Sequence, residues 1–188
     1  MTAKEVEADE TARFGSMIGN TVSAFAQEDD IPINESKIPI QSVMTKRELV
    51  ERERFVYIRL AIQDHTWPRP EEIDDFILLV RDLDPDQIWL HFHCQAGKGR
   101  TGIMMIIYDM IRNPDVAMED IVIRQTLPGG NYPLYTENSD NYKAPHYAEK
   151  ARMTPLLYAY VQEAYADGFS VLWSDWLTTR GADTAKTE

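Results

Sequence analysis

The segment HCQAGKGRTG at residues 93–102 constrains the fold of this chain more than any other. It follows the apolar run Ile88–Cys94, which is typical of a buried strand, and it leads into the apolar helical pattern Arg100–Arg112. A glycine-rich loop between a strand and a helix is the basic element of an α/β domain. We therefore predict an α/β fold in which a central, mainly parallel sheet is flanked by helices.

The same loop has the composition of a phosphate-binding cradle. Gly97 and Gly99 allow the positive φ angles that let successive backbone N–H groups turn toward one anion. The N-terminus of the following helix adds a partial positive charge to this site. The residues expected to supply the N–H groups are Gln95, Ala96, Gly97, Lys98, Gly99 and Arg100.

Cys94 and Arg100 have the chemistry needed for covalent phosphate transfer. The Arg100 guanidinium can bind two phosphate oxygens at once and stabilise their charge. The same arginine and the helix terminus lower the pKa of the Cys94 thiol, so that the nucleophilic thiolate exists near neutral pH. Thr101 is placed to hydrogen-bond the sulfur and help it leave. No metal and no other cofactor are expected in this reaction.

Two other interpretations of this segment are weaker. The glycines at 97, 99 and 102 match a dinucleotide-binding pattern, but no acidic residue ends the next strand at the required distance. His91, His93 and Cys94 could suggest a zinc site, yet strand alternation points Cys94 away from both histidines and no fourth ligand is evident. A phosphate-binding loop remains the best interpretation.

The reaction also needs a general acid, because the alkoxide that leaves must gain a proton. Asp64 is the candidate, since it lies in the segment QDHTWPRP at 63–70, where two prolines predict a loop after the β-rich run Phe55–Leu60. Asp74 and Asp75 fall on one predicted helix and are expected to be solvated. The alternative role for Asp64 is that of a loop-capping residue.

Weaker patterns organise the rest of the chain into three parts. Residues 1–37 form an N-terminal segment that is expected to be an incomplete start of the domain, 38–178 the domain that carries the phosphate-binding loop, and 179–188 a frayed tail. Thr154 and Pro155 are expected to begin the second of two helices, or to interrupt one kinked helix. The expected elements are a strand at Thr21–Phe25 and helices at Glu10–Ile18, Thr45–Arg52, Glu71–Leu83, Glu119–Gln125, His146–Met153 and Pro155–Ala166, followed by an aromatic tail at Phe169–Leu177 that packs on the body.

Charge and apolar content narrow the classes of partner. The net charge of −12 opposes binding to nucleic acid or to anionic lipid. No apolar run approaches the roughly 18 residues of a membrane span. The first ten residues are acidic, which is unlike a secretory signal. A small polyanion held by a local basic cluster is therefore the expected ligand.

The motif from Cys94 to Arg100, with an acid on a Trp–Pro loop, resembles the cysteine-dependent protein tyrosine phosphatases. The segments QDHTWP at 63–68, WLHFHCQAGKGRTG at 89–102, Arg124–Gln125 before Gly129–Gly130, and NYKAPHYAEK at 141–150 are similar to the bacterial PTP-like phytases. That resemblance implies hydrolysis of inositol hexakisphosphate through a cysteinyl-phosphate. The roles it implies are nucleophile for Cys94, phosphate clamp for Arg100, general acid for Asp64, and substrate contacts for His65, Lys143, Tyr147 and Lys150.

Several alternatives remain open at the level of sequence. Gln95 and Lys98 make the loop more positive than the usual pattern of this family, which favours a polyanion over phosphotyrosine. A protein tyrosine or dual-specificity phosphatase, a phosphoinositide phosphatase, and a non-catalytic inositol-phosphate binding module are the other candidates. The oligomeric state is unknown. The compartment is also open, because members of this family are often exported: secreted or periplasmic for a truncated chain, otherwise cytoplasmic.

Overall fold

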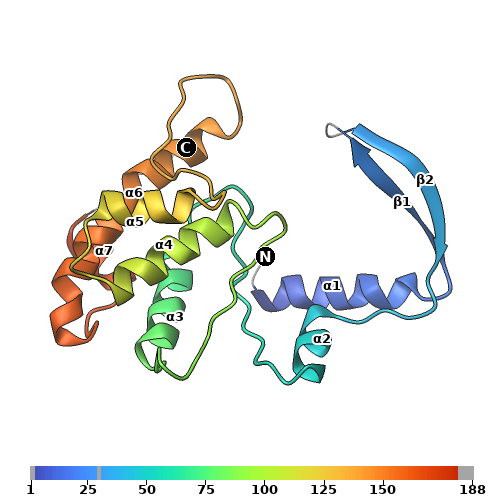
Figure 1. The fold of residues 1–188 in the computed structure, drawn as a ribbon, viewed down its shortest axis with the longest axis horizontal. Helices are drawn as coiled ribbons and strands as arrows, with labels where there is room; N and C mark the ends of the chain where they lie inside the picture. The colour runs from blue at the N-terminus through green and yellow to red at the C-terminus, as the bar shows by residue number, and fades with distance from the viewer. Residues whose placement is uncertain (1–2, 29–30, 182–188) are drawn as a thin grey trace. The chain divides into compact units, whose positions relative to one another are not determined.

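The computed structural model describes residues 3–28 and 31–181, and these residues form two compact units (Figure 1). The first unit ends at Ala61 and the second begins at Ile62. The second unit contains the phosphate-binding segment at 93–102 and the segment at 63–70 that carries Asp64, which we call the acid loop. It also contains Lys143 and Lys150. The limits of the phosphatase domain expected from the sequence, 38–178, remain a proposal.

The first unit consists of two helices and a β-hairpin. The two strands pair antiparallel, from Thr21 opposite Pro39 to Glu28 opposite Ile31. The sequence predicts the first helix of this unit at Glu10–Ile18 and the first strand at Thr21–Phe25. Both elements are present, and both are longer than predicted. Its elements are α1 (Ala3–Met17), β1 (Thr21–Glu28), β2 (Ile31–Pro39) and α2 (Lys46–Arg52).

The start of α2 follows the capping pattern that the sequence predicts. The backbone N–H of Glu48 donates to the Thr45 hydroxyl, and the Glu48 carboxylate accepts from the Thr45 backbone N–H at 2.7 Å. These reciprocal bonds satisfy two N–H groups that the first helical turn leaves without partners. The prediction of a capped helix at Thr45–Arg52 is confirmed.

The second unit is a helical body around one apolar core. Ile73 and Ile77 of α3, Ile107 of α4, Ile121 of α5 and Leu157 of α6 are each almost completely buried there. Its helices are α3 (Pro70–Arg81), α4 (Arg100–Arg112), α5 (Met118–Thr126), α6 (Ala144–Ala164), the 3-10 turn η1 (Tyr165–Asp167) and α7 (Trp173–Thr179). The predicted α4 begins and ends at the expected residues.

An aromatic cluster closes this core at the C-terminal end. Trp173 and Trp176 of α7 stack with ring centroids 5.4 Å apart, and both contact the Tyr160 ring. Phe169 lies against the same tyrosine. The predicted packing of the aromatic tail is confirmed. Helix α7 includes Thr179, the first residue of the expected frayed tail. Residues 182–188 of that tail lie outside the described residues.

Two predictions about individual helical residues are wrong. Residues 144–164 form one helix that contains Pro155, as the second of the two alternatives predicts, so Thr154 does not cap a separate helix; its hydroxyl donates to the Lys150 carbonyl one turn earlier at 2.7 Å. Asp74, which was expected to be solvated, is buried, and its carboxylate accepts a hydrogen bond from the Ser174 backbone N–H at 3.1 Å. Asp75 is exposed, as predicted.

The central parallel sheet is not confirmed. Among residues 3–28 and 31–181 the β-ladder is the β1–β2 hairpin, and the runs predicted at Phe55–Leu60 and Ile88–Cys94 carry no ladder. The prediction of a buried strand is wrong at Trp89, which is 80% exposed. Alternation is nevertheless present, because Leu90, Phe92 and Cys94 are half-buried while the residues between them are exposed. The fold is thus a mixture of helix and sheet.

Asp109 joins α4 to α5 through buried charge. Its carboxylate accepts hydrogen bonds from Arg124 Nε at 2.6 Å and from Gln125 Nε2 at 2.8 Å, and Asn113 completes the group. Burial alone would raise the pKa of Asp109, but these hydrogen bonds and the arginine charge hold the pKa below its ordinary value. The Arg124–Gln125 pair seen in the sequence is therefore a structural clamp on α4.

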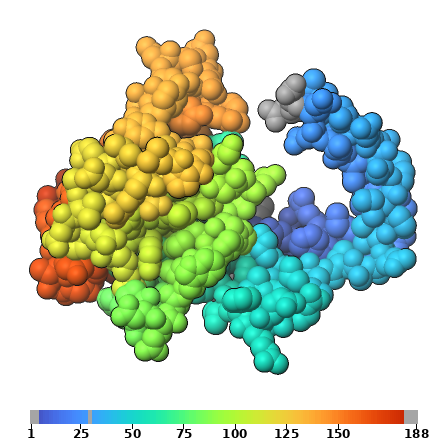
Figure 2. Space-filling view, in the orientation of Figure 1, coloured from blue at the N-terminus to red at the C-terminus, as the bar shows by residue number. Residues whose placement is uncertain are grey.

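None of the helices within the described residues is long and apolar enough to span a membrane. The loop between α5 and α6 projects from the second unit at the top of the space-filling view (Figure 2). It runs through residues 131–143, most of which are exposed. This loop reaches the phosphate-binding segment through its first residue, Asn131, whose backbone N–H donates to the Lys98 carbonyl at 3.1 Å.

We predict that Asp109→Asn lowers the free energy of unfolding by about 2–4 kcal/mol. Loss of the buried carboxylate leaves the arginine and the amide groups that donate to it without an acceptor for every N–H. Urea unfolding followed by circular dichroism measures the loss. Asp115→Asn is the matched control, since Asp115 is exposed near the end of the same helix. Equal stability of the two variants would contradict the role of Asp109 as a clamp.

Candidate phosphate-transfer site

The loop after Cys94 folds as a series of tight bends that ends at the first residue of α4. Gly97 has a φ of 72°, so the predicted need for a positive angle is confirmed there. The same prediction is wrong for Gly99, which has a φ of −83° because it serves as the N-cap of α4. The cradle thus depends on one glycine for its bend and on the helix start for its second half.

The environment of Cys94 favours the thiolate. Burial raises the pKa of the thiol, but hydrogen bonds from Thr101 and from the backbone N–H groups of Ala96 and Gly97 outweigh burial and lower the pKa from 9.0 to about 7. Among the described residues, the buried Thr101 hydroxyl has no other hydrogen-bond partner. The nucleophilic thiolate is therefore accessible near neutral pH.

Asp64, the predicted acid, and Arg100, the predicted phosphate clamp, lie close together. Arg100 Nε is 3.2 Å from Asp64 Oδ1, and Arg100 Nη1 donates to the Ile62 carbonyl at 3.5 Å. The Asp64 side chain is 59% exposed, whereas that of Arg100 is 26% exposed. The acid therefore stands at the solvent side of the site and the arginine lies beneath it.

The acid loop is held by local contacts. The backbone N–H of His65 donates to Asp64 Oδ1 at 3.0 Å, and His65 itself takes a positive φ of 68°. Two residues later, Trp67 is buried and anchors the loop to the second unit. The His65 ring meets the edge of Tyr142, with centroids 5.9 Å apart. His65 thus lies beside the acid on one side and the α5–α6 loop on the other.

Three of the residues predicted to contact the substrate lie at the start of α6. Tyr147 and Lys150 occupy its first turns, and Lys143 is its N-cap. Lys150 Nζ lies over the Tyr147 ring at 5.4 Å, and Lys143 Nζ lies over the Tyr142 ring at 5.5 Å. Lys150 is buried, which lowers its pKa, while the nearby charge of Asp64 acts in the opposite direction. A buried ammonium facing a carboxylate indicates a site suited to anions.

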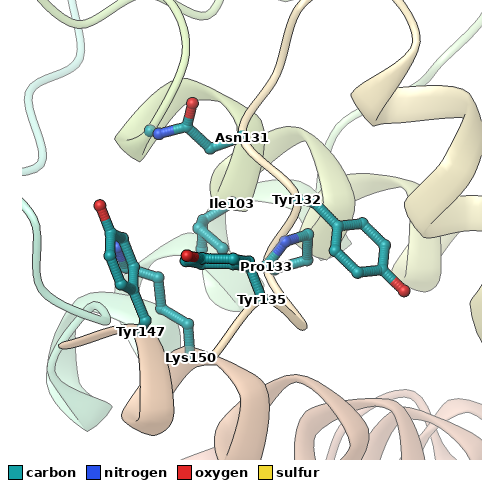
Figure 3. Close-up of a pocket in the computed structure, with 8 residues that line it drawn as sticks. Ile103, Asn131, Tyr132, Pro133, Tyr135, Tyr147 and Lys150 are labelled. Atoms are coloured by element: carbon teal, nitrogen blue, oxygen red, sulfur yellow. The ribbon is translucent and has the colours of Figure 1, made fainter. Parts of the chain in front are cut away.

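A pocket with a volume of about 260 Å³ opens beside the phosphate-binding loop (Figure 3). Two predicted residues of α6, Tyr147 and Lys150, line it together with Gly99 of the loop. Cys94, Asp64, His65 and Lys143 are not among its lining residues. Sequence reasoning missed the rest of the wall, which consists of Ile103, Asn131, Tyr132, Pro133 and Tyr135.

The missed residues come from a segment that the sequence shows only as polar, aromatic and irregular. Its position is set by Gly130, because a Cβ there would lie 2.6 Å from the Gln125 carbonyl oxygen. The paired glycines after Arg124–Gln125 were the available signal for a close approach of two backbones. They indicated a turn, but not that the turn delivers Asn131 to the phosphate-binding loop.

The alternative metal interpretation gains no support. Within the described ranges, no cluster of three or more His, Cys, Asp or Glu side chains is arranged to hold a metal ion. His91 and His93 lie on one exposed face with ring centroids 5.8 Å apart, and Cys94 belongs to the opposite, half-buried face. The arrangement of charges fits an anion and a nucleophilic sulfur instead.

Comparison with known proteins agrees with this geometry. A family described as PTP-like phytase, inositol hexakisphosphate, matches residues 4–112. The chain is 43% identical to a PTP-like myo-inositol phosphatase from Mitsuokella multacida, solved with myo-inositol-(1,3,4,5)-tetrakisphosphate, with a TM-score of 0.87 over 95% of this chain and 31% of that one. A PTP-like phytase from Bdellovibrio bacteriovorus is 30% identical, with a TM-score of 0.79 over 95% of this chain and 64% of that one.

Among curated proteins, the effector protein hopD2 of Pseudomonas syringae pv. tomato is 28% identical over 137 residues, which are 72% of this chain and 29% of that protein. The chain therefore spans about a third of the length of the Mitsuokella protein and of the effector. The family match covers more than half of the 188 residues. From the cysteine loop, the acid beside its arginine and this match, we conclude that the chain belongs to the PTP-like phytase family.

Proposed function

We propose that this protein hydrolyses phosphomonoesters of myo-inositol polyphosphates through a cysteinyl-phosphate intermediate. The observation that carries the proposal is the thiol of Cys94, with its pKa near 7, in a loop whose arginine lies 3.2 Å from an exposed carboxylate. The buried Lys150 beside the same loop supports a substrate with more than one phosphate. The Mitsuokella relative was solved with an inositol tetrakisphosphate, which is consistent with this substrate class.

The proposed first step forms a sulfur–phosphorus bond. The Cys94 thiolate attacks phosphorus while the ester P–O bond breaks, and its electron pair stays on the inositol oxygen. Protonated Asp64 gives its proton to that oxygen, so the alcohol leaves neutral. Arg100 must turn from Asp64 to the equatorial phosphate oxygens, where it stabilises their charge in the transition state.

The proposed second step restores the enzyme. A water molecule attacks phosphorus, the S–P bond breaks, and the thiolate returns to its N–H groups and to Thr101. The Asp64 carboxylate takes the proton from the attacking water, which makes it an acid again for the next cycle.

The peripheral phosphates of the substrate are proposed to bind His65, Lys143, Tyr147 and Lys150. We also propose that Ile88–Cys94 is a strand of a parallel sheet leading into the cradle.

A second candidate function is a protein tyrosine phosphatase. Three tyrosines, Tyr132, Tyr135 and Tyr147, line the pocket, and an aromatic wall suits the flat ring of phosphotyrosine. The net charge of −12 argues against a phosphoinositide phosphatase that works at an anionic lipid surface. Phosphate release from inositol hexakisphosphate, compared with release from a phosphotyrosine peptide, separates the first two functions. Binding without release would favour a non-catalytic binding module.

Cys94→Ser is expected to abolish turnover and to leave inositol hexakisphosphate binding measurable, because the cradle is made of backbone N–H groups and Arg100. In the unaltered chain, the rate of Cys94 alkylation should rise with pH around a midpoint near 7, since only the thiolate reacts. Chelators should not change activity. Turnover that survives the serine substitution, or a midpoint at 9, would rule out an activated thiolate.

Asp64→Asn is expected to lower kcat for alkyl phosphates by about 10²–10⁴-fold, the usual effect of one acid–base group. The loss should be much smaller for p-nitrophenyl phosphate, whose leaving group needs no proton. Asp75→Asn is the matched control, because Asp75 is an exposed aspartate of α3. A similar loss on both substrates would assign Asp64 to binding or folding.

Lys143→Ala and Lys150→Ala should each raise KM for inositol hexakisphosphate and leave p-nitrophenyl phosphate nearly unaffected, because a lysine that binds only peripheral phosphates acts on binding more than on kcat. Added salt should weaken the larger substrate more. Lys46→Ala is the control, since Lys46 is exposed on α2. Equal effects on both substrates, or faster cleavage of the phosphotyrosine peptide, would favour the second candidate.

A further inference from the structure

Asn131 is the point at which the α5–α6 loop meets the phosphate-binding loop. Its backbone N–H donates to the Lys98 carbonyl at 3.1 Å. The preceding residue, Gly130, lies so close to the Gln125 carbonyl that a Cβ would not fit. Gln125 in turn donates to the buried Asp109. The backbone of Asn131 is thus fixed relative to the cradle by contacts that do not involve its own side chain.

The Asn131 side chain is free to act on a ligand. It lines the pocket next to Gly99, where a Cβ on the glycine would lie 3.7 Å from Asn131 Nδ2. Over the part of the chain that the structure describes, its amide has no hydrogen-bond partner, and the side chain is exposed. An amide held beside Gly99 offers a neutral N–H donor at the rim of the anion cradle.

Figure 3 shows Asn131 at one end of the pocket, apart from Tyr147 and Lys150 at the other. Lys150 supplies a cation at its end. A ligand anchored by one phosphate in the cradle has its neighbouring substituents on either side of that phosphate. The lysine and the asparagine are therefore placed to bind different substituents of the same molecule.

We propose that Asn131 is a specificity-determining residue whose Nδ2 donates to the phosphate next to the scissile one on an inositol polyphosphate. The proposal rests on the function inferred above and adds a contact that sequence reasoning did not find. It distinguishes polyphosphates from monophosphates, because a monoester has no neighbouring phosphate for the amide to bind. Side-chain substitutions at 131 keep the backbone tether to Lys98, so they test the amide alone.

The test is made in the non-hydrolysing Cys94→Ser background, where affinity is measured directly by calorimetry. Adding Asn131→Ala should weaken inositol hexakisphosphate binding by about 10- to 150-fold, the range expected for a hydrogen bond to a charged group. Binding of inorganic phosphate should stay within about twofold, since the cradle supplies those contacts. Asn138→Ala, an exposed asparagine of the same loop outside the pocket, is the matched control.

Asn131→Asp sharpens the test, because it keeps the size of the side chain and replaces the donor with a negative charge. It should weaken inositol hexakisphosphate binding more than Asn131→Ala does, and the added loss should shrink with salt. In the active chain, Asn131→Ala should raise KM for inositol hexakisphosphate and spare kcat for p-nitrophenyl phosphate, a split that a structural role does not produce.

Three results would overturn the proposal. Unchanged hexakisphosphate affinity in Asn131→Ala removes the contact, and an aspartate that binds as well as asparagine makes the partner a hydroxyl group rather than a phosphate. An equal loss for inorganic phosphate would show that residue 131 supports the cradle only. If the Cys94→Ser parent itself fails to bind inositol hexakisphosphate while it binds inorganic phosphate, the proposed function fails, and the inference fails with it.

Discussion

The site depends on the stabilisation of negative charge at Cys94 by fixed dipoles. A half-buried thiol would ordinarily resist ionisation, because burial disfavours the charged form. Here hydrogen bonds from the Thr101 side chain and from the N–H groups of Thr101, Gly97 and Ala96 outweigh that penalty. These groups converge because Gly97 takes a positive φ and because α4 begins at Arg100. The same N–H groups suit a phosphate oxygen as well as a sulfur, so one piece of backbone serves both reactants.

Arg100 connects this cradle to the acid loop. Its guanidinium lies beside Asp64 and reaches the Ile62 carbonyl. A phosphate in the cradle competes with Asp64 for the same arginine. Substrate binding would therefore release the carboxylate from its cationic neighbour at the point where a proton donor is needed.

The sequence predicts those parts of the molecule that local rules determine. The glycine loop that leads into α4, the α2 cap and the placement of Tyr147 and Lys150 on one helix follow from short-range geometry. Long-range contacts were missed. Asp74 is buried by a backbone group 100 residues away, and Asn131 enters the site through Lys98. Periodicity cannot indicate such pairs, because each partner alone has the pattern of an exposed or irregular residue.

The acidic character of the whole chain and the basic character of the pocket act over different distances. At physiological salt the field of exposed charges fades within about 8 Å, so a net charge of −12 repels anions weakly at long range. Inside the pocket, the buried Lys150 and the dipoles of the loop are screened much less. A released phosphate keeps only the contacts of the cradle, whereas a polyphosphate also keeps those of the pocket wall. For the proposed reaction, this arrangement would favour retention of a multiply charged substrate over retention of inorganic phosphate.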